Sequence, residues 1–271
     1  MFKQSLNRAI ISLTLWPEGP LLVKTDVPAG NHAENADVEM FCVRTLHGPA
    51  SETVYLPGSS LKGMLRAYCE AIARTIGLWC CPLFDEEKRC SKPLENEPDT
   101  AKRYRESCSI CRTFGSTALA SRMRIADAYP TPETWERANR TEIRNHVAID
   151  RVLGSSAKGA LFAVEVVTGG CFPTQITLEN FELWQLGLLA LALRDLEAGQ
   201  IPMGYGKSRG MGNLGAAVTS VTVEYPGFVP VNDGKAMRRL GRTEPWSLQV
   251  AVSDDPAKVK MRVYGVGCFV D

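Results

Sequence analysis

Short apolar runs along the chain predict four strands. Residues 9–16 alternate apolar and polar side chains, and residues 123–129, 160–167 and 214–223 are brief apolar stretches with β-branched residues. Runs of this length, bounded by turn-forming residues, are typical of strands with one or both faces buried.

Helical spacing of apolar residues predicts two long helices. The first starts at Ser59 or Ser60, either of which can cap a helix, and it runs to about Ile76 with Gly77 as its stop. The second starts after Asn180 and ends at Gly199. The predicted buried stripes are Leu61, Leu65, Cys69, Ile72 and Ile76 in the first helix, and Phe181, Trp184, Leu188, Leu191 and Leu196 in the second.

The order of these elements is strand, helix, strand, strand, helix, strand, which is the split βαβ order of a ferredoxin-like α+β fold. We therefore expect one such domain over residues 1–225. Residues 17–53 predict a long loop around a short apolar patch at 38–43, and residues 79–114 a charged insertion. Residues 130–159 predict an extended arm, and residues 226–271 an extension that packs on the core or on a neighbouring subunit.

The composition is that of an ordinary globular protein. The 271 residues are 45% hydrophobic and carry a formal net charge of +1. Affinity for nucleic acid must then come from local basic patches. No apolar run approaches the roughly 20 residues of a membrane span, and the chain does not begin with a secretory pattern. We expect a cytoplasmic protein without a membrane partner.

Two glycine-bearing segments combine backbone amides with basic side chains. In the first, Gly58, Ser59 and Ser60 open the first helix, and Lys62 and Arg66 follow four residues apart on one face. Helix starts favour anions, and lysine and arginine add discrete charges. A well-capped helix with a solvated basic face is the alternative interpretation.

The second segment follows the second helix and contains four glycines and two basic residues within nine positions, with no acidic residue. Successive amides in such a turn can form an anion-binding nest. Neither a P-loop nor a dinucleotide fingerprint fits, because the segment follows a helix and precedes a strand. A plain glycine-rich turn is the alternative, but two such segments together favour phosphate binding. Its members are Gly204, Gly206, Lys207, Ser208, Arg209, Gly210 and Gly212.

Five of the nine cysteines lie within the insertion. Cys108 and Cys111 are separated by two residues, a gap that lets both thiolates bind one tetrahedral zinc. Cys90 and one of the adjacent pair Cys80 and Cys81 complete the set; Cys81 is favoured because a proline follows it. A structural zinc would supply folding energy to a segment with little core. A redox pair is the alternative, without thioredoxin-like surroundings to support it.

The segment from Pro57 to Arg66, the later segment 141–151 and the glycine loop after the second helix resemble, in this order, the RAMP superfamily of CRISPR proteins. More narrowly, they resemble backbone subunits of type III effector complexes of the Csm/Cmr kind. The resemblance implies an RRM-like palm and a β-hairpin thumb within residues 130–159. It implies RNA contacts from Gly58, Ser59, Ser60, Lys62, Arg66, Arg144, His146, Gly204, Gly206, Lys207, Ser208, Arg209 and Gly210.

The same resemblance implies that the complex cuts target RNA paired to its guide, with Asp37 as the cutting residue. A carboxylate beside a scissile phosphate can hold Mg²⁺ or Mn²⁺, which neutralises developing charge. The loop lacks the family's run of glycines and the proline after the aspartate. Asp26 and Glu39 are therefore rivals for the role, and His32 could assist proton transfer.

Other functions remain open at this point. The chain could be a catalytically inactive scaffold of the same complex, or a guide-processing endoribonuclease with the same core and glycine loop. An unrelated zinc-stabilised binding module is a further alternative. The partners that the resemblance implies are guide CRISPR RNA, target RNA, related RAMP subunits and a large Cas10-type subunit.

Overall fold

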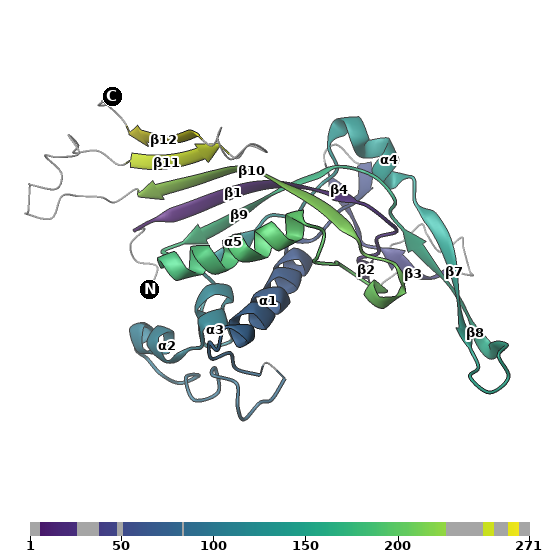
Figure 1. The fold of residues 1–271 in the computed structure, drawn as a ribbon, viewed down its shortest axis with the longest axis horizontal. Coiled ribbons are helices and arrows are strands. Elements are labelled where there is room, and N and C mark those ends of the chain that lie inside the picture. Colours follow the sequence, from purple (N-terminus) through teal and green to yellow (C-terminus); the bar gives the residue numbers. More distant parts are fainter. Residues whose placement is uncertain are drawn as a thin grey trace, which may run out of the picture.

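A six-stranded sheet forms the centre of the computed structural model, which describes residues 6–25, 38–47, 51–82, 84–225, 246–251 and 260–265. The strand order is β12-β11-β10-β1-β9-β6, and every neighbouring pair is antiparallel (Figure 1). The strands are β1 (Arg8–Pro17), β6 (Met123–Ile125), β9 (Phe172–Glu179), β10 (Leu214–Tyr225), β11 (Trp246–Ala251) and β12 (Lys260–Gly265).

Two long helices, α1 (Gly58–Thr75) and α5 (Leu183–Glu197), lie on the same face of this sheet (Figure 1). The predicted α+β class is therefore confirmed. The prediction for the third core strand is wrong: residues 160–167 belong to a separate hairpin, and β9 takes the place between β1 and β6. Alternate side chains of β9, from Phe172 to Leu178, are buried. Leu161, in the segment predicted as core, is 69% exposed.

The start of α1 differs from the prediction. The helix begins at Gly58 with Pro57 as its N-cap, so neither Ser59 nor Ser60 caps it. Proline has no N–H to satisfy and tolerates this position, which moves the helix start toward the N-terminus. The predicted stop is confirmed, because Gly77 follows the helix with a φ of 76°.

The start of α5 also differs. Glu182 is the N-cap and forms a reciprocal capping box with Gln185, whereas Asn180 precedes the helix with a φ of 49°. Gly199 ends the segment with a φ of 69°, as predicted. Most of the predicted buried stripes lie in the core or against it. Two of those predictions are wrong, since Ile76 is 60% and Leu191 is 39% exposed.

An antiparallel hairpin of β7 (Glu142–Ile149) and β8 (Ser156–Val166) projects away from the central sheet (Figure 1). At its base, β8 pairs in parallel with β3 (Val38–Cys42), which pairs in turn with β2 (Lys24–Thr25). The arm predicted at 130–159 begins instead with the short helices η2 (Pro132–Thr134) and α4 (Trp135–Asn139). The hairpin therefore starts and ends later than predicted.

The remaining elements are short. Residues 17–53, predicted as a loop, hold β2, β3 and β4 (Arg44–His47), and β4 pairs with β5 (Ser51–Val54). The insertion contains α2 (Thr100–Glu106) and α3 (Ser109–Phe114), and α3 packs on α1 within the main core. In the C-terminal extension, β11 and β12 continue the central sheet beside β10. Within the described ranges, no helix is both long and apolar enough to span a bilayer.

Candidate nucleic-acid groove and metal centre

The two glycine-bearing segments border one groove of about 380 Å³. Ser60 and Gly63 of α1 line one side of it. Gly204, Tyr205 and Lys207 of the glycine loop line the other. Segments far apart in the sequence thus share one surface, as a common role in binding a single ligand requires. The remaining lining residues are Val23, Lys24, Met64, Ala67 and Met203.

Close backbone packing fixes the glycine loop beside the segment that follows β1. Gly204 has a φ of 83°, and a Cβ atom there would lie 2.3 Å from the carbonyl oxygen of Leu22. The N–H of Tyr205 donates to the same oxygen at 2.8 Å. The N–H of Gly212 donates to the carbonyl of Pro20, also at 2.8 Å. The loop is therefore held in one position by backbone contacts that only glycine permits at residue 204.

The basic part of the loop is a 3-10 turn, η3 (Lys207–Arg209), between Gly206 and Gly210, whose φ values are 72° and 75°. All three side chains of the turn are exposed. The first N–H groups of a helical turn have no acceptor within it, so they point outward beside the side chains. Amides and Lys207 thus lie together beside the groove, and Arg209 of the same turn lies over Tyr205, which lines it. This arrangement suits a phosphate.

Stacked side chains join the glycine loop to the hairpin. The guanidinium of Arg209 lies 4.7 Å from the ring of Tyr205 and 5.8 Å from the ring of Phe162 on β8. Phe162 stacks in turn on His146 of β7, with ring centres 5.4 Å apart. Arg144 points elsewhere: it is exposed and pairs with a neighbouring glutamate, Glu142, at 2.6 Å. His146 is thus part of the junction between hairpin and groove, and Arg144 is not.

A carboxylate accepts the hydrogen bond of the first amide of α1. The N–H of Gly58 donates to Oδ1 of Asp127 at 2.7 Å. A Cβ atom at Gly58 would lie 2.3 Å from the carbonyl oxygen of Ile125, so the helix start packs tightly on the end of β6. Sequence reasoning missed Asp127, because nothing local links residue 127 to a helix that begins 69 residues earlier. Ser59 is exposed and Ser60 half-buried beside this contact.

Lys62 and Arg66 are engaged within the protein and do not border the groove. Nζ of Lys62 donates to Oγ of Ser121 at 2.8 Å. Burial, and then the charge of Arg66, lower the pKa of Lys62 below its ordinary value. Arg66 pairs with Glu70 at 3.1 Å and donates to the carbonyl of Gly115 at 3.0 Å. Their predicted contact with guide phosphates stays a prediction.

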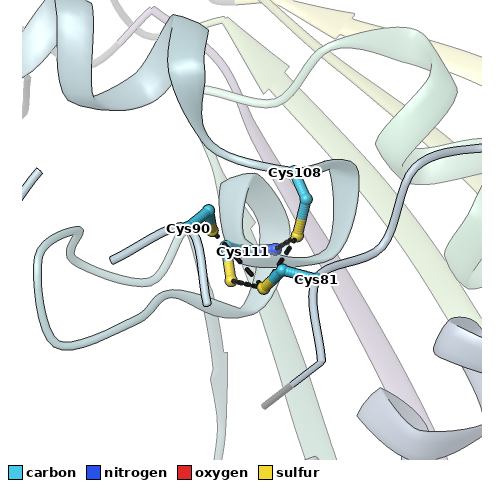
Figure 2. Close-up of side chains that lie close together, drawn as sticks. All are labelled: Cys81, Cys90, Cys108 and Cys111. Carbon is cyan, nitrogen blue, oxygen red and sulfur yellow. Dashed lines mark hydrogen bonds between the residues drawn. The ribbon is translucent and has the colours of Figure 1, made fainter. Parts of the chain in front are cut away.

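The thiols of Cys81, Cys90, Cys108 and Cys111 converge on one point (Figure 2). All four side chains are buried, and their sulfur atoms lie within 4.8 Å of one another. The N–H of Cys111 also donates to Sγ of Cys108 at 3.4 Å, at the start of α3. Cys80 is half-buried and does not belong to the cluster. Of the two adjacent cysteines, the structure therefore selects Cys81.

The distances between the sulfurs fit a tetrahedral metal ion. Sγ of Cys81 lies 3.5 Å from that of Cys90, 3.6 Å from that of Cys108 and 3.8 Å from that of Cys111. A tetrahedral zinc with Zn–S bonds of about 2.3 Å places neighbouring sulfurs about 3.8 Å apart. A disulfide would need about 2.0 Å. The four thiols are thus able to hold a metal ion such as zinc.

Asp37, the predicted cutting residue, lies outside the described residues, as do Asp26 and His32. Glu39, the remaining rival, lies on β3 and is exposed. Val38, which follows Asp37, pairs with Ala163 of β8. Ala163 is adjacent to Phe162, the residue beside Arg209. Val38 and Arg209 therefore lie beside neighbouring residues of β8.

A buried ion pair lies at the base of the hairpin, which sequence reasoning also missed. Arg44 and Glu165 pair at 2.5 Å, and their side chains are 7% and 8% exposed. Burial raises the pKa of Glu165, but hydrogen bonds from Thr141 and the N–H of Cys42, together with Arg44, outweigh it and hold the pKa below its ordinary value. The pair borders a cavity of about 310 Å³. It joins β4 to the hairpin strand β8.

A family model described as the RAMP superfamily matches residues 45–214. No curated protein matches. The matched range begins in β4 and ends at the first residue of β10, so it contains α1, the cysteine cluster, the hairpin and the glycine loop. Proteins of this superfamily act with RNA in multisubunit CRISPR-associated complexes. Because the match covers more than half of the 271 residues and includes both segments that border the groove, the chain belongs to the RAMP superfamily.

Proposed function

We propose that this protein binds guide RNA as a backbone subunit of a type III CRISPR ribonucleoprotein, and that the groove between α1 and the glycine loop holds the guide. The observation that carries the proposal is that both glycine-bearing segments border this one groove. The partners we propose are guide CRISPR RNA, target RNA, related RAMP subunits and a large Cas10-type subunit.

The chemistry of the groove suits a chain of phosphates. Lys207 and Arg209 supply positive charge. The amides at the start of η3 can donate hydrogen bonds to phosphate oxygens. The positive φ values of Gly204 and Gly206 allow the tight turn that places Lys207 at the groove. Arg209 also stacks on Tyr205, which holds its guanidinium in place without neutralising it.

Structural zinc is the metal that we propose for the cysteine cluster. Four thiolates without a water position make a closed site, which is typical of structural rather than catalytic zinc. The bound metal would link Cys81 and Cys90, at the start of the insertion, to Cys108 and Cys111 on α3.

Cleavage of target RNA by Asp37, with Mg²⁺ or Mn²⁺, is the second part of the proposal. The position of Asp37, upstream of the segment from Pro57 to Arg66 and just before a short apolar patch, supports it by resemblance, and so does the pairing of Val38 with β8 near Arg209. Two alternatives stand beside it: a catalytically inactive scaffold, and a guide-processing endoribonuclease.

The test of guide binding is the salt dependence of affinity for a single-stranded RNA of guide length. Each phosphate contact contributes about 0.7 to the slope of log K against log salt on a single strand. Lys207→Ala and Arg209→Ala should each lower the slope by about that amount. The matched control is Lys102→Ala, an exposed lysine of α2 in the insertion, which should leave the slope unchanged. An affinity that does not vary with salt would refute the proposed groove.

The test of cleavage uses the assembled complex with a complementary target. Asp37→Ala should keep guide binding and abolish target cleavage, whereas Glu39→Ala should retain it. Retained cleavage in Asp37→Ala would refute the assignment of this residue. A parent complex that binds the target without cutting it would favour the scaffold. Cutting of an unprocessed CRISPR transcript without target or divalent metal would favour the guide-processing enzyme.

A further inference from the structure

Lys62 and Arg66, the two basic residues of the first glycine-bearing segment, both point to the stretch of chain that carries Cys111. Arg66 donates from Nη2 to Sγ of Cys111 at 3.6 Å and from Nη1 to the carbonyl of Gly115 at 3.0 Å. Lys62 donates to Ser121, a few residues further along. We propose that Arg66 is an outer-sphere partner of the metal centre, which strengthens metal binding and ties α1 to the insertion, and that it does not contact guide phosphate.

The charge of the centre explains why an arginine lies there. A divalent ion with four thiolates carries a net charge of −2, and the cluster is buried, so uncompensated charge is costly. The guanidinium of Arg66 lies within hydrogen-bond distance of one of these sulfurs, that of Cys111. An N–H···S bond to a ligand sulfur stabilises the thiolate form that binds metal.

The position of Arg66 is fixed on three sides. Nε pairs with Glu70 one turn along α1, and the arginine side chain is only 18% exposed. The acceptor carbonyl belongs to Gly115, which has a φ of 84° and would place a Cβ atom 2.8 Å from the N–H nitrogen of Ser121. The carbonyl of Gly115 and the sulfur of Cys111 thus accept hydrogen bonds from two nitrogens of one planar guanidinium. Lysine has a single nitrogen and cannot reproduce this forked geometry.

The location on α1 separates this role from RNA binding. The residues of α1 that border the groove are Ser60, Gly63, Met64 and Ala67, and Arg66 is not among them. Its partners are Glu70 on α1 itself, Cys111 in the insertion and Gly115 directly after it. Loss of Arg66 should therefore weaken the metal site and leave the count of phosphate contacts unchanged.

The experiment measures metal affinity directly on the full chain, by competition for zinc with a chromogenic chelator and by the thiolate charge-transfer absorption of the cobalt(II) form. Arg66→Met should weaken metal binding about 10- to 100-fold. The matched control is Arg74→Met, because Arg74 is on the same helix, is 52% exposed and contacts the same Glu70. The control should bind metal like the parent. With zinc in excess, the salt slope of RNA binding should be the same in Arg66→Met and the parent.

Two results would overturn the proposal: unchanged metal affinity in Arg66→Met, or a salt slope lowered by about 0.7, the value for one phosphate contact on a single strand. If Arg66→Met does not fold, Arg66→Lys provides the same test, since it keeps the charge and loses the fork. Metal affinity equal to that of the parent in Arg66→Lys would likewise refute it. The metal measurement does not depend on RNA, so it stands even if the parent shows no salt-dependent affinity and the proposed groove fails.

Discussion

Two glycines of the loop after α5 separate the cost of a left-handed backbone from the cost of a steric clash. Gly204 and Gly210 have φ values of 83° and 75°, so alanine at either site adopts the same unfavourable conformation. At Gly210, no atom lies within 4 Å of the added Cβ. At Gly204, the Cβ would lie 2.3 Å from the carbonyl oxygen of Leu22. That oxygen also accepts the hydrogen bond from Tyr205.

The expected magnitudes follow from this difference. The left-handed conformation costs a non-glycine residue about 1–2 kcal/mol, which is the whole effect expected for Gly210→Ala. Gly204→Ala adds an overlap with backbone that cannot rotate away, at about 1–3 kcal/mol. The total for Gly204→Ala is then about 2–5 kcal/mol. Under the proposed function, the displaced loop should also bind RNA more weakly, because η3 follows Gly204 closely.

Urea unfolding followed by tryptophan fluorescence measures both variants against the parent. The midpoint for Gly204→Ala should fall clearly below that for Gly210→Ala, with the same slope on denaturant. Equal destabilisation of the two variants would refute the close approach of the loop to Leu22. A larger loss in Gly210→Ala would refute the assignment of open space at that residue.

Three further predictions concern the buried polar sites. Cys108→Ser should lower metal content and unfolding temperature, measured by elemental analysis and calorimetry, whereas Cys80→Ser should change neither, because Cys80 is outside the cluster. Arg44→Met leaves the carboxylate of Glu165 buried without its cation, so we expect a loss of about 3–5 kcal/mol in urea unfolding; a loss below about 1 kcal/mol would contradict the buried pair. Because folding lowers the pKa of Glu165, its charge stabilises the fold fully at pH values above the ordinary pKa of glutamate, and this stability is lost as the pH falls through the lowered pKa. Glu165→Gln should therefore flatten the acid side of the unfolding profile, and an unchanged profile would contradict the shift.

Local patterns in the sequence predict much of the fold and one of the sites. The apolar periodicity predicts α1 and α5, and the two-residue gap predicts that the thiols of Cys108 and Cys111 lie close together. Both signals depend on residues that are near in sequence. The predicted third strand at 160–167 fails for a different reason. The strand at these residues, β8, belongs to a second sheet with β2, β3 and β7. Its apolar composition is like that of a strand in the central sheet, and only its tertiary pairing distinguishes the two.

The contacts of the basic residues could not be predicted from sequence. The spacing of Lys62 and Arg66 places them on one face of a helix but does not say which segment packs there. The partners Ser121 and Gly115 follow the insertion and are brought to α1 by the packing of α3. In the same way, the carboxylate of Asp127 reaches Gly58 only because β6 ends beside the start of α1.

The shortness of β6 limits how copies of this protein can assemble. An open sheet flank offers unpaired N–H and C=O groups to which a further strand can add, and very short outer strands suppress such addition. With only three residues, β6 offers little backbone for pairing on its outer side. If copies assemble in a row, as the proposed function implies, we expect side chains and the guide RNA to hold them in register, and not a continuous ladder through this flank.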